Sequence, residues 1–448
     1  MTGSAVTRGV TISRGQDARE VRMDTQWWVL GFALALTALT ISALVRPGWL
    51  VRDNMLWSAC SWFAGEFAGW LAGASLLLLL ATALGTNALV AEPGRLAALL
   101  IVASACGLVA VSRRARHTPV VLESALREAL GPSYLREVPP ERMPAVVEEV
   151  PRRVYLRPWP RRSPAVDLVA DLPYPGGHER NRLDLYRPAA GCRDAPVLLQ
   201  IHGGGWTQGH KRQHGLPLVH HLASLGWIVV SPNYRLGPGA RMPSALVDCK
   251  AAMAWIRAHI AAYGGDPSFV AVTGGGAGAH LATLMALSFG EPELQPGFEH
   301  VDTKPAACVP LHGIYDLADR RQRHPGRRAR LRWLGDNLMP CPLERDALAW
   351  DMASPLALLR RDAPPFFVLH GTHDALCPVA EAREFARELG RVSDDPVAYA
   401  ELDGAQHGWD TLCSPRALHT VRAVTRFLEW CAARHRAQGP RRTVSSRA

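Results

Sequence analysis

From about residue 165 onward, short apolar segments alternate with longer amphipathic ones, and this alternation limits the fold more than any other feature of the sequence. The strand-like segments are AVDLVADL, NRLDLYRP, APVLLQI, WIVVSPNY, FVAVTG, ACVPLHG, PPFFVLHG and VAYAELDG. Apolar strands that alternate with helices form a mostly parallel sheet covered on both faces. The sequence therefore predicts an α/β domain over residues 165–435. Ligand sites in such sheets lie beyond the carboxyl ends of the strands.

Three apolar runs precede this domain, at residues 27–45, 67–85 and 96–112. The first holds 19 residues without a charge, which is long enough to cross a bilayer as a helix. A cleaved signal peptide would have one shorter apolar region, and a buried helical hairpin is the other alternative. We expect residues 25–112 to form a membrane anchor of about three spans, after a disordered tail over 1–24. We expect this anchor to place the protein in a plasma membrane, and arginines on both sides leave its orientation open.

The formal charge of +10 is carried almost wholly by arginine. No nucleic-acid motif or aromatic stacking platform accompanies this charge, so we expect no nucleic-acid partner. Residues 113–164 are rich in proline and arginine and are predicted to form a connector, which either rests on anionic lipid headgroups or is simply solvated. Residues 436–448 are predicted to be a basic disordered tail.

A run of glycines follows the third predicted strand in the stretch IHGGGW, residues 201–206. Glycines without a Cβ let backbone N–H groups turn toward a common point. Donors aimed at a developing negative charge form an oxyanion hole, and a glycine run at this place is typical of lipases and esterases. The expected donors are Gly203, Gly204 and Gly205, with the backbone N–H of Ala277.

The stretch VTGGGAGAHLA, residues 272–282, has the shape of a G-x-S-x-G nucleophile elbow, a strand that turns sharply into a helix. Its central position holds Gly276 rather than serine. Asp374 follows one later strand, and His407 follows the last strand. Both therefore fall at the edge of the sheet where a site is expected.

These motifs together resemble an α/β-hydrolase of the carboxylesterase group that includes hormone-sensitive-lipase-like enzymes. The matching stretches are HGGGW, SPNYRLGP, YGGDPSFVAVTGGGAGAHLA, HGTHDALCPV and GAQHGWD. More narrowly, the chain is similar to actinobacterial esterases with an N-terminal membrane segment, and kynurenine formamidases share part of the pattern. The family order Ser…Asp/Glu…His implies that position 276, Asp374 and His407 form the triad.

A glycine at the nucleophile position predicts that the acyl-enzyme route is closed. The leading interpretation is a membrane-anchored carboxylesterase or lipase scaffold for a small ester or lipid-like substrate, without metal or cofactor and inactive as given. An engineered Ser→Gly change and a natural pseudoenzyme both fit. An alternative of another class is a non-catalytic membrane-tethered protein that binds a ligand or regulates a partner. In a third, His407 activates water directly on a labile ester.

His312 and Asp316 also follow a strand and are spare candidates for the triad, whereas His202 is expected to orient the glycine loop and His280 to be structural. Residues 316–351 lie where these enzymes often carry a cap. Seven of the eight arginines in this segment, those between 320 and 332, either are solvated or draw the cap to anionic lipid; they are Arg320, Arg321, Arg323, Arg327, Arg328, Arg330 and Arg332.

Overall fold

The computed structural model describes residues 14–45, 55–147, 150, 158–160, 163–324 and 326–438. The chain divides into two compact units, one of residues 1–45 and 63–112 and the other of residues 46–62 and 113–448. Most of the predicted tail over 1–24 and 436–448 lies outside the described residues, although the first helix begins at Arg14 and the last ends at Gln438.

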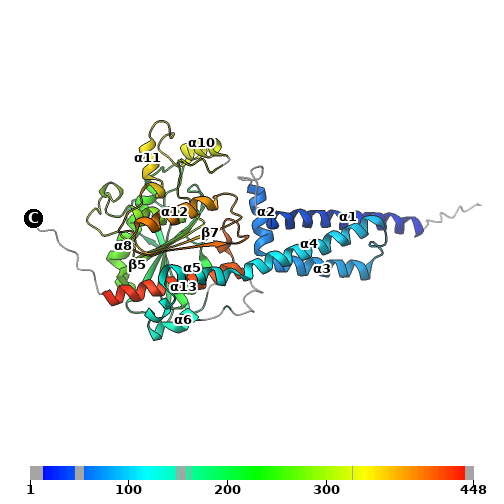
Figure 1. Ribbon diagram of the computed structural model, residues 1–448, viewed down its shortest axis with the longest axis horizontal. Helices are drawn as coiled ribbons and strands as arrows, with labels where there is room; N and C mark the ends of the chain where they lie inside the picture. The colour runs from blue at the N-terminus through cyan, green and yellow to red at the C-terminus, as the bar shows by residue number, and fades with distance from the viewer. Residues whose placement is uncertain are drawn as a thin grey trace, which may run out of the picture. The chain divides into compact units, whose positions relative to one another are not determined.

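The first unit is made of apolar helices that lie side by side (Figure 1). They are α1 (Arg14–Leu44), α3 (Ala68–Gly85) and α4 (Glu92–Arg116). Alanines such as Ala33, Ala68 and Ala97 fill their contacts, because small residues let helix backbones approach closely. Three segments are long and apolar enough to cross a membrane, at Thr25–Leu44, Ala68–Gly85 and Glu92–Leu130. They cover the three apolar runs seen in the sequence.

The second unit is built on an eight-stranded sheet of order β1-β2-β4-β3-β5-β6-β7-β8. Strands β3 to β8 pair in parallel, whereas β1 and β2 run antiparallel at one edge. The strands are β1 (Val166–Pro173), β2 (Arg182–Pro188), β3 (Ala195–Ile201), β4 (Ile228–Pro232), β5 (Gly265–Gly275), β6 (Ala307–Leu311), β7 (Phe366–Gly371) and β8 (Val397–Leu402). The predicted mostly parallel α/β fold is confirmed.

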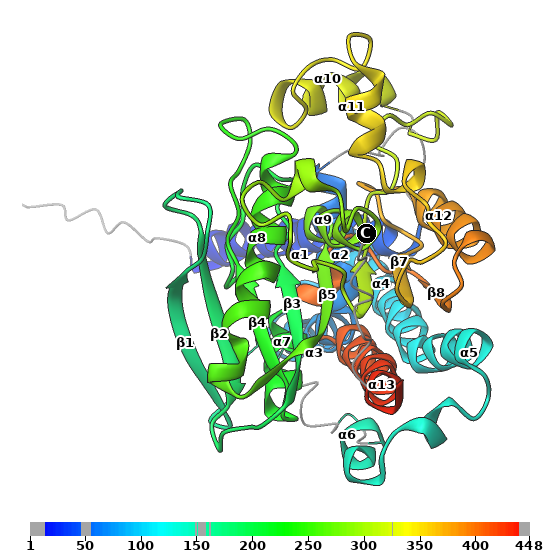
Figure 2. The ribbon, with the colours of Figure 1, turned by 90° about the vertical axis from the view of Figure 1, so that its left-hand side faces the viewer.

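Helices cover both faces of this sheet (Figure 2). One face packs against α8 (Ser244–His259), α9 (Ala277–Leu287) and α12 (Val379–Val392). The other packs against α5 (Thr118–Leu130), α7 (Leu216–Ser224) and α13 (Pro415–Gln438). The central strands are buried along their whole length, as β3 and β7 show, and this burial explains why they read as continuous apolar runs.

Part of the predicted connector packs on the domain core. It contains α5, the short helix α6 (Met143–Val147) and two 3₁₀ turns at Tyr134–Glu137 and Pro140–Arg142. Arg142 forms an ion pair with Glu429, which is fully buried and also accepts a hydrogen bond of 2.7 Å from the indole N–H of Trp227. The segment is therefore held by a buried charge pair as well as by apolar contacts.

The remaining helices are short, and most of them lie in the segments that connect the strands. A cap-like segment between β6 and β7 holds α10 (Arg327–Asn337) and α11 (Ala347–Met352), while α2 (Met55–Glu66) comes before the sheet and contributes its first two turns to the second unit. Short 3₁₀ helices lie at Ile260–Tyr263, Pro292–Leu294, Pro355–Ala357 and Trp409–Thr411.

Candidate active site

Gly276 lies at a sharp turn between the end of β5 at Gly275 and the start of α9 at Ala277. Its backbone has φ of 56° and ψ of −113°, a region that residues with a side chain adopt only under strain. Two backbone hydrogen bonds fix the turn: the Gly276 N–H donates to the Leu311 carbonyl at 3.0 Å, and the His280 N–H donates to the Gly276 carbonyl at 3.0 Å. The geometry is therefore that of an elbow that presents position 276 at the sheet edge.

Asp374 and His407 lie together beside this elbow. The Nδ1 of His407 donates to Oδ2 of Asp374 at 2.8 Å. The backbone N–H groups of Leu376 and Cys377 donate to the other carboxylate oxygen at 2.9 and 2.7 Å, so the carboxylate is held on both sides. A Cβ built on Gly276 would lie 2.9 Å from Nε2 of His407. The three predicted triad positions are thus brought together.

The charges of this pair support each other. Burial alone would raise the pKa of Asp374, but the neighbouring His407 and His370 hold it well below its usual value. Burial alone would lower the pKa of His407, but the Asp374 carboxylate raises it well above 6.5. Each partner therefore favours the charged form of the other, and Nε2 of His407 is a stronger base than that of an isolated histidine.

Gln406 joins the loops that carry the two residues. Its side-chain oxygen accepts from the backbone N–H of Ala375 at 2.7 Å and from that of His407 at 3.0 Å. Sequence reasoning did not single out Gln406, because its partner lies 31 positions away and neither local spacing nor apolar pattern marks such a bond.

The glycine loop after β3 faces the same turn. A Cβ on Gly203 would lie 2.7 Å from the Gly275 carbonyl oxygen, so the loop and the elbow touch through bare backbone. Gly204 has φ of 110°, and a Cβ there would lie 2.2 Å from the Gln208 carbonyl oxygen, which excludes any side chain. Gly203, Gly204, Gly205 and Ala277 all line the cavity that Gly276 and His407 line.

This cavity has a volume of about 690 Å³, which is ordinary for a small-molecule site. The cap-like segment contributes Trp333 and Leu334 to its wall, and α2 contributes Met55. The indole N–H of Trp62, on the same helix, donates to the Gly408 carbonyl at 3.0 Å. The loop that carries His407 is therefore held in place by a residue more than 300 positions earlier in the chain.

His312 lines the cavity, whereas Asp316 does not. Nε2 of His312 donates to Oδ1 of Asp410 at 2.8 Å, and the His312 and His407 rings meet edge to face with centroids 4.3 Å apart. Asp316 instead accepts from the backbone N–H of Arg320 at 2.8 Å. Of the two spare candidates, only His312 is near the predicted triad.

His202 and His280 take part in internal bonds. Nδ1 of His202 donates to the Gly203 carbonyl at 2.8 Å, its ring stacks on Tyr234 at 4.2 Å, and burial lowers its pKa to about 3. Nε2 of His280 donates to the Ala353 carbonyl at 2.7 Å, its Nδ1 accepts from the Trp206 indole at 3.2 Å, and burial lowers its pKa to about 4. Both rings are therefore neutral and hold the loop in shape.

Most arginines of the segment 316–351 are paired within the domain. Arg321 and Arg323 contact Glu384 at 3.2 and 2.8 Å, and Arg330 contacts Glu381 at 2.8 Å. Arg320 pairs with Asp351, and Arg327 lies 4.0 Å from Asp319. Five of the seven arginines thus have a carboxylate partner, which weakens the case for a lipid-binding cap.

Cys377 also lines the cavity and was not found by sequence reasoning, which looked for a thiol only near position 276. Burial raises the pKa of its thiol, so the neutral form prevails. Within the described ranges, Asp374, Cys377 and His407 form the one group whose ligand atoms, all within 4.8 Å of one another, could hold a metal ion. Because the carboxylate and imidazole already bond each other, we assign no metal to this group.

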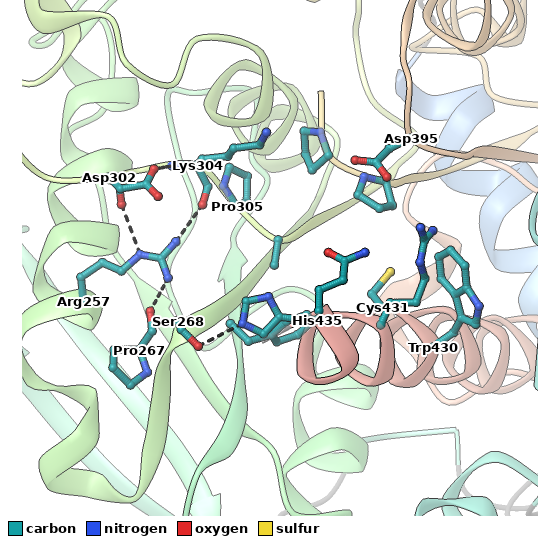
Figure 3. Close-up of a pocket in the computed structure, with 16 residues that line it drawn as sticks. Arg257, Pro267, Ser268, Asp302, Lys304, Pro305, Asp395, Trp430, Cys431 and His435 are labelled. Carbon is teal, nitrogen blue, oxygen red and sulfur yellow. Dashed lines mark hydrogen bonds between the residues drawn. The ribbon is translucent and has the colours of Figure 1, made fainter. Parts of the chain in front are cut away.

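A second cavity, of about 420 Å³, lies near the C-terminal part of α13 (Figure 3). Its cationic side chains already have partners: Arg257 donates to the carbonyls of Pro267, Asp302 and Lys304, and His435 contacts the Ser268 hydroxyl at 3.0 Å. These bonds hold neighbouring segments of the domain together, so we assign no ligand to this cavity.

Comparison with known proteins agrees with this geometry. The BD-FAE family model matches residues 183–389. The chain is 40% identical over 426 residues to the probable carboxylic ester hydrolase LipM of Mycobacterium tuberculosis, covering 91% of this chain and 95% of that protein. It is 40% identical over 329 residues to the esterase LipQ of the same organism, covering 72% and 77% of the two chains.

Among solved structures, esterase B from Lactobacillus rhamnosis aligns with a TM-score of 0.51 at 20% identity, over 64% of this chain and 93% of that one. This likeness bears on the fold, whereas the match to LipM extends over nearly the whole of both chains. The chain therefore belongs to the carboxylic ester hydrolase family with the α/β-hydrolase fold.

Proposed function

We propose that this protein is a membrane-anchored esterase scaffold whose cavity binds carboxylic esters but whose acyl-enzyme route is closed at Gly276. One observation carries the proposal. The His407–Asp374 pair lies against position 276, with Nε2 of His407 2.9 Å from where a Cβ would be, inside a cavity that the 203–205 loop also lines. This arrangement supports an acyl-transfer site that lacks only the nucleophilic hydroxyl.

The chemistry of such a site sets the roles of these residues. An ester carbonyl seated against Gly203–Gly205 and Ala277 would develop negative charge on its oxygen, which backbone N–H donors stabilise. His407 would accept a proton from the nucleophile and return it to the leaving alcohol, while Asp374 orients the ring and stabilises the imidazolium. The raised pKa of His407 suits this base and acid role.

Glycine at position 276 removes the nucleophile of the first step. In a hydrolase with this triad, loss of the nucleophile lowers turnover by about 10⁶. The oxyanion donors and substrate binding alone retain roughly 10³–10⁴ over the uncatalysed reaction. We therefore expect the chain to bind esters without forming an acyl-enzyme, and an engineered and a natural origin of Gly276 predict the same behaviour.

The decisive experiment compares the full chain in detergent with Gly276→Ser and Gly276→Ala. A fluorophosphonate probe is expected to add one adduct mass to Gly276→Ser and none to the other two proteins. Hydrolysis of p-nitrophenyl butyrate is expected to rise by at least about a hundredfold in Gly276→Ser alone, a conservative part of the 10⁶ above. Labelling of the unmodified chain would reveal another nucleophile and overturn the proposal.

The N-terminal helices support the membrane part of the proposal. Three segments have the length and hydropathy of membrane spans, and the exposed surface of α3 carries Leu77, Leu80 and Leu84, which would face lipid rather than water. The full chain is expected to stay in the pellet after an alkaline carbonate wash of bacterial membranes and to be released by detergent. Extraction by carbonate alone would contradict the anchor.

A non-catalytic binding or regulatory role is the second candidate, favoured by the missing hydroxyl. The two candidates differ in the serine variant: a scaffold that lost only its nucleophile regains turnover, whereas a repurposed cavity does not, even though it still binds its ligand.

A further inference from the structure

A second histidine–carboxylate pair lies beside the elbow, with its imidazole against that of the first pair. His312 follows β6, and its side chain is 5% exposed. Its Nε2 donates to Asp410, as described above, and burial together with the nearby His407 lowers its pKa. Burial alone would raise the pKa of Asp410, but His312 holds it below its usual value. The pair is therefore a neutral imidazole bonded to an ionised carboxylate.

The hydrogen bonds to the two carboxylates fix the tautomers of both rings. In its neutral form, which prevails above its raised pKa, His407 carries its proton on Nδ1, whereas the neutral His312 carries its proton on Nε2. In that state Nε2 of His407 and Nδ1 of His312 are both acceptors. Both acceptors face the same place: a Cβ on Gly276 would lie 2.9 Å from the first and 3.7 Å from the second. Nδ1 of His312 is buried and has no hydrogen-bond partner among the described residues.

Two successive glycines give these rings their positions. A Cβ on Gly275 would lie 2.8 Å from Cε1 of His312, so a side chain there would push this ring away. A side chain on Gly276 would press on Nε2 of His407. The backbone is therefore bare where the two imidazoles approach it, and the space next to Gly276 opens into the 690 Å³ cavity.

A buried acceptor without a partner destabilises the fold, and water often satisfies such groups. A water molecule can donate one O–H to each of two acceptors. Its lone pairs then point away from the two rings, and the 203–205 loop lines the same cavity as Gly276 and both imidazoles. This is the orientation that a nucleophile needs.

We propose that His407 and His312 together hold a hydrolytic water beside Gly276, so that the protein cleaves activated esters in a single displacement. The proposal rests on the proposed function, because it requires the cavity to bind an ester. His407 Nε2 takes one proton from the water as its oxygen bonds to the ester carbon. The tetrahedral intermediate then expels the alcohol, which receives that proton from Nε2, and the acid remains.

His312 holds the water through its second hydrogen and takes no proton itself. General-base assistance contributes about 10²–10⁴ in rate, on top of what the oxyanion donors provide. Turnover is therefore expected above the buffer rate and far below that of Gly276→Ser. Cys377 gives no covalent route here, because its thiol is buried and its pKa is raised.

The experiment measures p-nitrophenyl acetate hydrolysis by the full chain in detergent. The unmodified protein is expected to show linear progress without a burst, insensitive to fluorophosphonate and to EDTA. His312→Phe keeps the ring and removes both nitrogens, and it is expected to lower this rate by about tenfold or more. Asp410→Asn keeps the side-chain shape and removes the charge that fixes the tautomer of His312, so it is expected to lower the rate as well.

The serine variant provides the matched background. With a hydroxyl at 276 the second imidazole has no water to hold, so His312→Phe is expected to lower the activity of Gly276→Ser by less than about threefold, a small part of a general-base effect. Equal losses in both backgrounds would show that His312 is only structural and would overturn the proposal. Rates unaffected by His312→Phe, or abolished by EDTA, would overturn it as well.

Binding is measured separately to keep the two proposals apart. The probe is the non-hydrolysable ketone isostere of p-nitrophenyl butyrate, whose nitrophenyl group quenches the fluorescence of Trp206 and Trp333 in the cavity wall. Quenching without hydrolysis above the buffer rate would refute the water mechanism and leave the proposed function intact. Absence of quenching by the ketone would refute both.

Discussion

Replacing Gly276 by alanine tests the elbow without adding any chemistry. At φ of 56° and ψ of −113°, a residue with a Cβ costs about 1–3 kcal/mol in strain. Alanine also restricts the unfolded chain, which returns about 0.4–1 kcal/mol. The net loss is therefore about 0–2.6 kcal/mol. At about 2 °C per kcal/mol for a domain of this size, the melting temperature should fall by up to roughly 5 °C.

Thermal melts of the full chain in detergent, followed by tryptophan fluorescence at one scan rate, measure this shift. Gly390 is the matched control, because it lies exposed in α12 and a Cβ there would meet only Val397 at 3.9 Å. Gly390→Ala should stabilise the fold by about 0.5–1 kcal/mol and therefore raise the melting temperature. A higher melting temperature for Gly276→Ala as well would refute the claim that the turn is strained for residues with a side chain, and with it the reason why glycine suits this position.

Part of the loss should come from the contact with His407. A Cβ 2.9 Å from Nε2 forces the ring to shift by a few tenths of an ångström, which disturbs its 2.8 Å bond to Asp374. In a His407→Ala background, Gly276→Ala should therefore cost less than it does alone. Fully additive losses would show that the ring does not press on position 276.

Four further outcomes are expected. Asp374→Asn should lower the melting temperature most between about pH 4 and 6.5. The depressed pKa of Asp374 contributes stability above the pKa of the unfolded carboxyl, and the raised pKa of His407 contributes its full stability below the pKa of the unfolded imidazole. A pH-independent difference would contradict this coupling. In the serine variant, kcat/KM should rise with pH through a midpoint above 6.5, and Gln406→Ala should lower kcat by about 10–100-fold, both measured with p-nitrophenyl butyrate. Glu429→Ala should cost about 3–5 kcal/mol in urea unfolding, whereas Glu401→Ala, whose arginine partner is 53% exposed, should cost at most about 1 kcal/mol.

The strands and their ends could be predicted well because local sequence carries that information. APVLLQI matches β3 residue for residue. Strand β5 begins at Gly265, earlier than FVAVTG suggests, because Gly265 pairs with Ala195 before the register shifts. The segment predicted as a connector contains α5, and its composition did not indicate that Leu122 and Leu126 would enter the domain core.

The candidate site could be predicted only where it follows strand ends. Asp374 and His407 come just after β7 and β8, and parallel strands bring their ends to one edge. The bond between His312 and Asp410 joins residues 98 positions apart, and the bond from Trp62 to Gly408 joins residues 346 apart. No periodicity marks such contacts, so the second imidazole pair and the role of α2 could not be read from the sequence.

The first two turns of α2 set a limit on how this enzyme scaffold can be dissected. A soluble fragment that starts at Arg113 would lack Met55 and the indole of Trp62. The cavity would lose the Met55 part of its lining, and the Gly408 carbonyl would lose its hydrogen bond from the indole. Its selectivity for acyl groups would differ from that of the intact protein even if it folded. Under the proposed function, tethering and substrate enclosure share one short stretch of chain, so a mutation in that stretch is expected to change which ester fits.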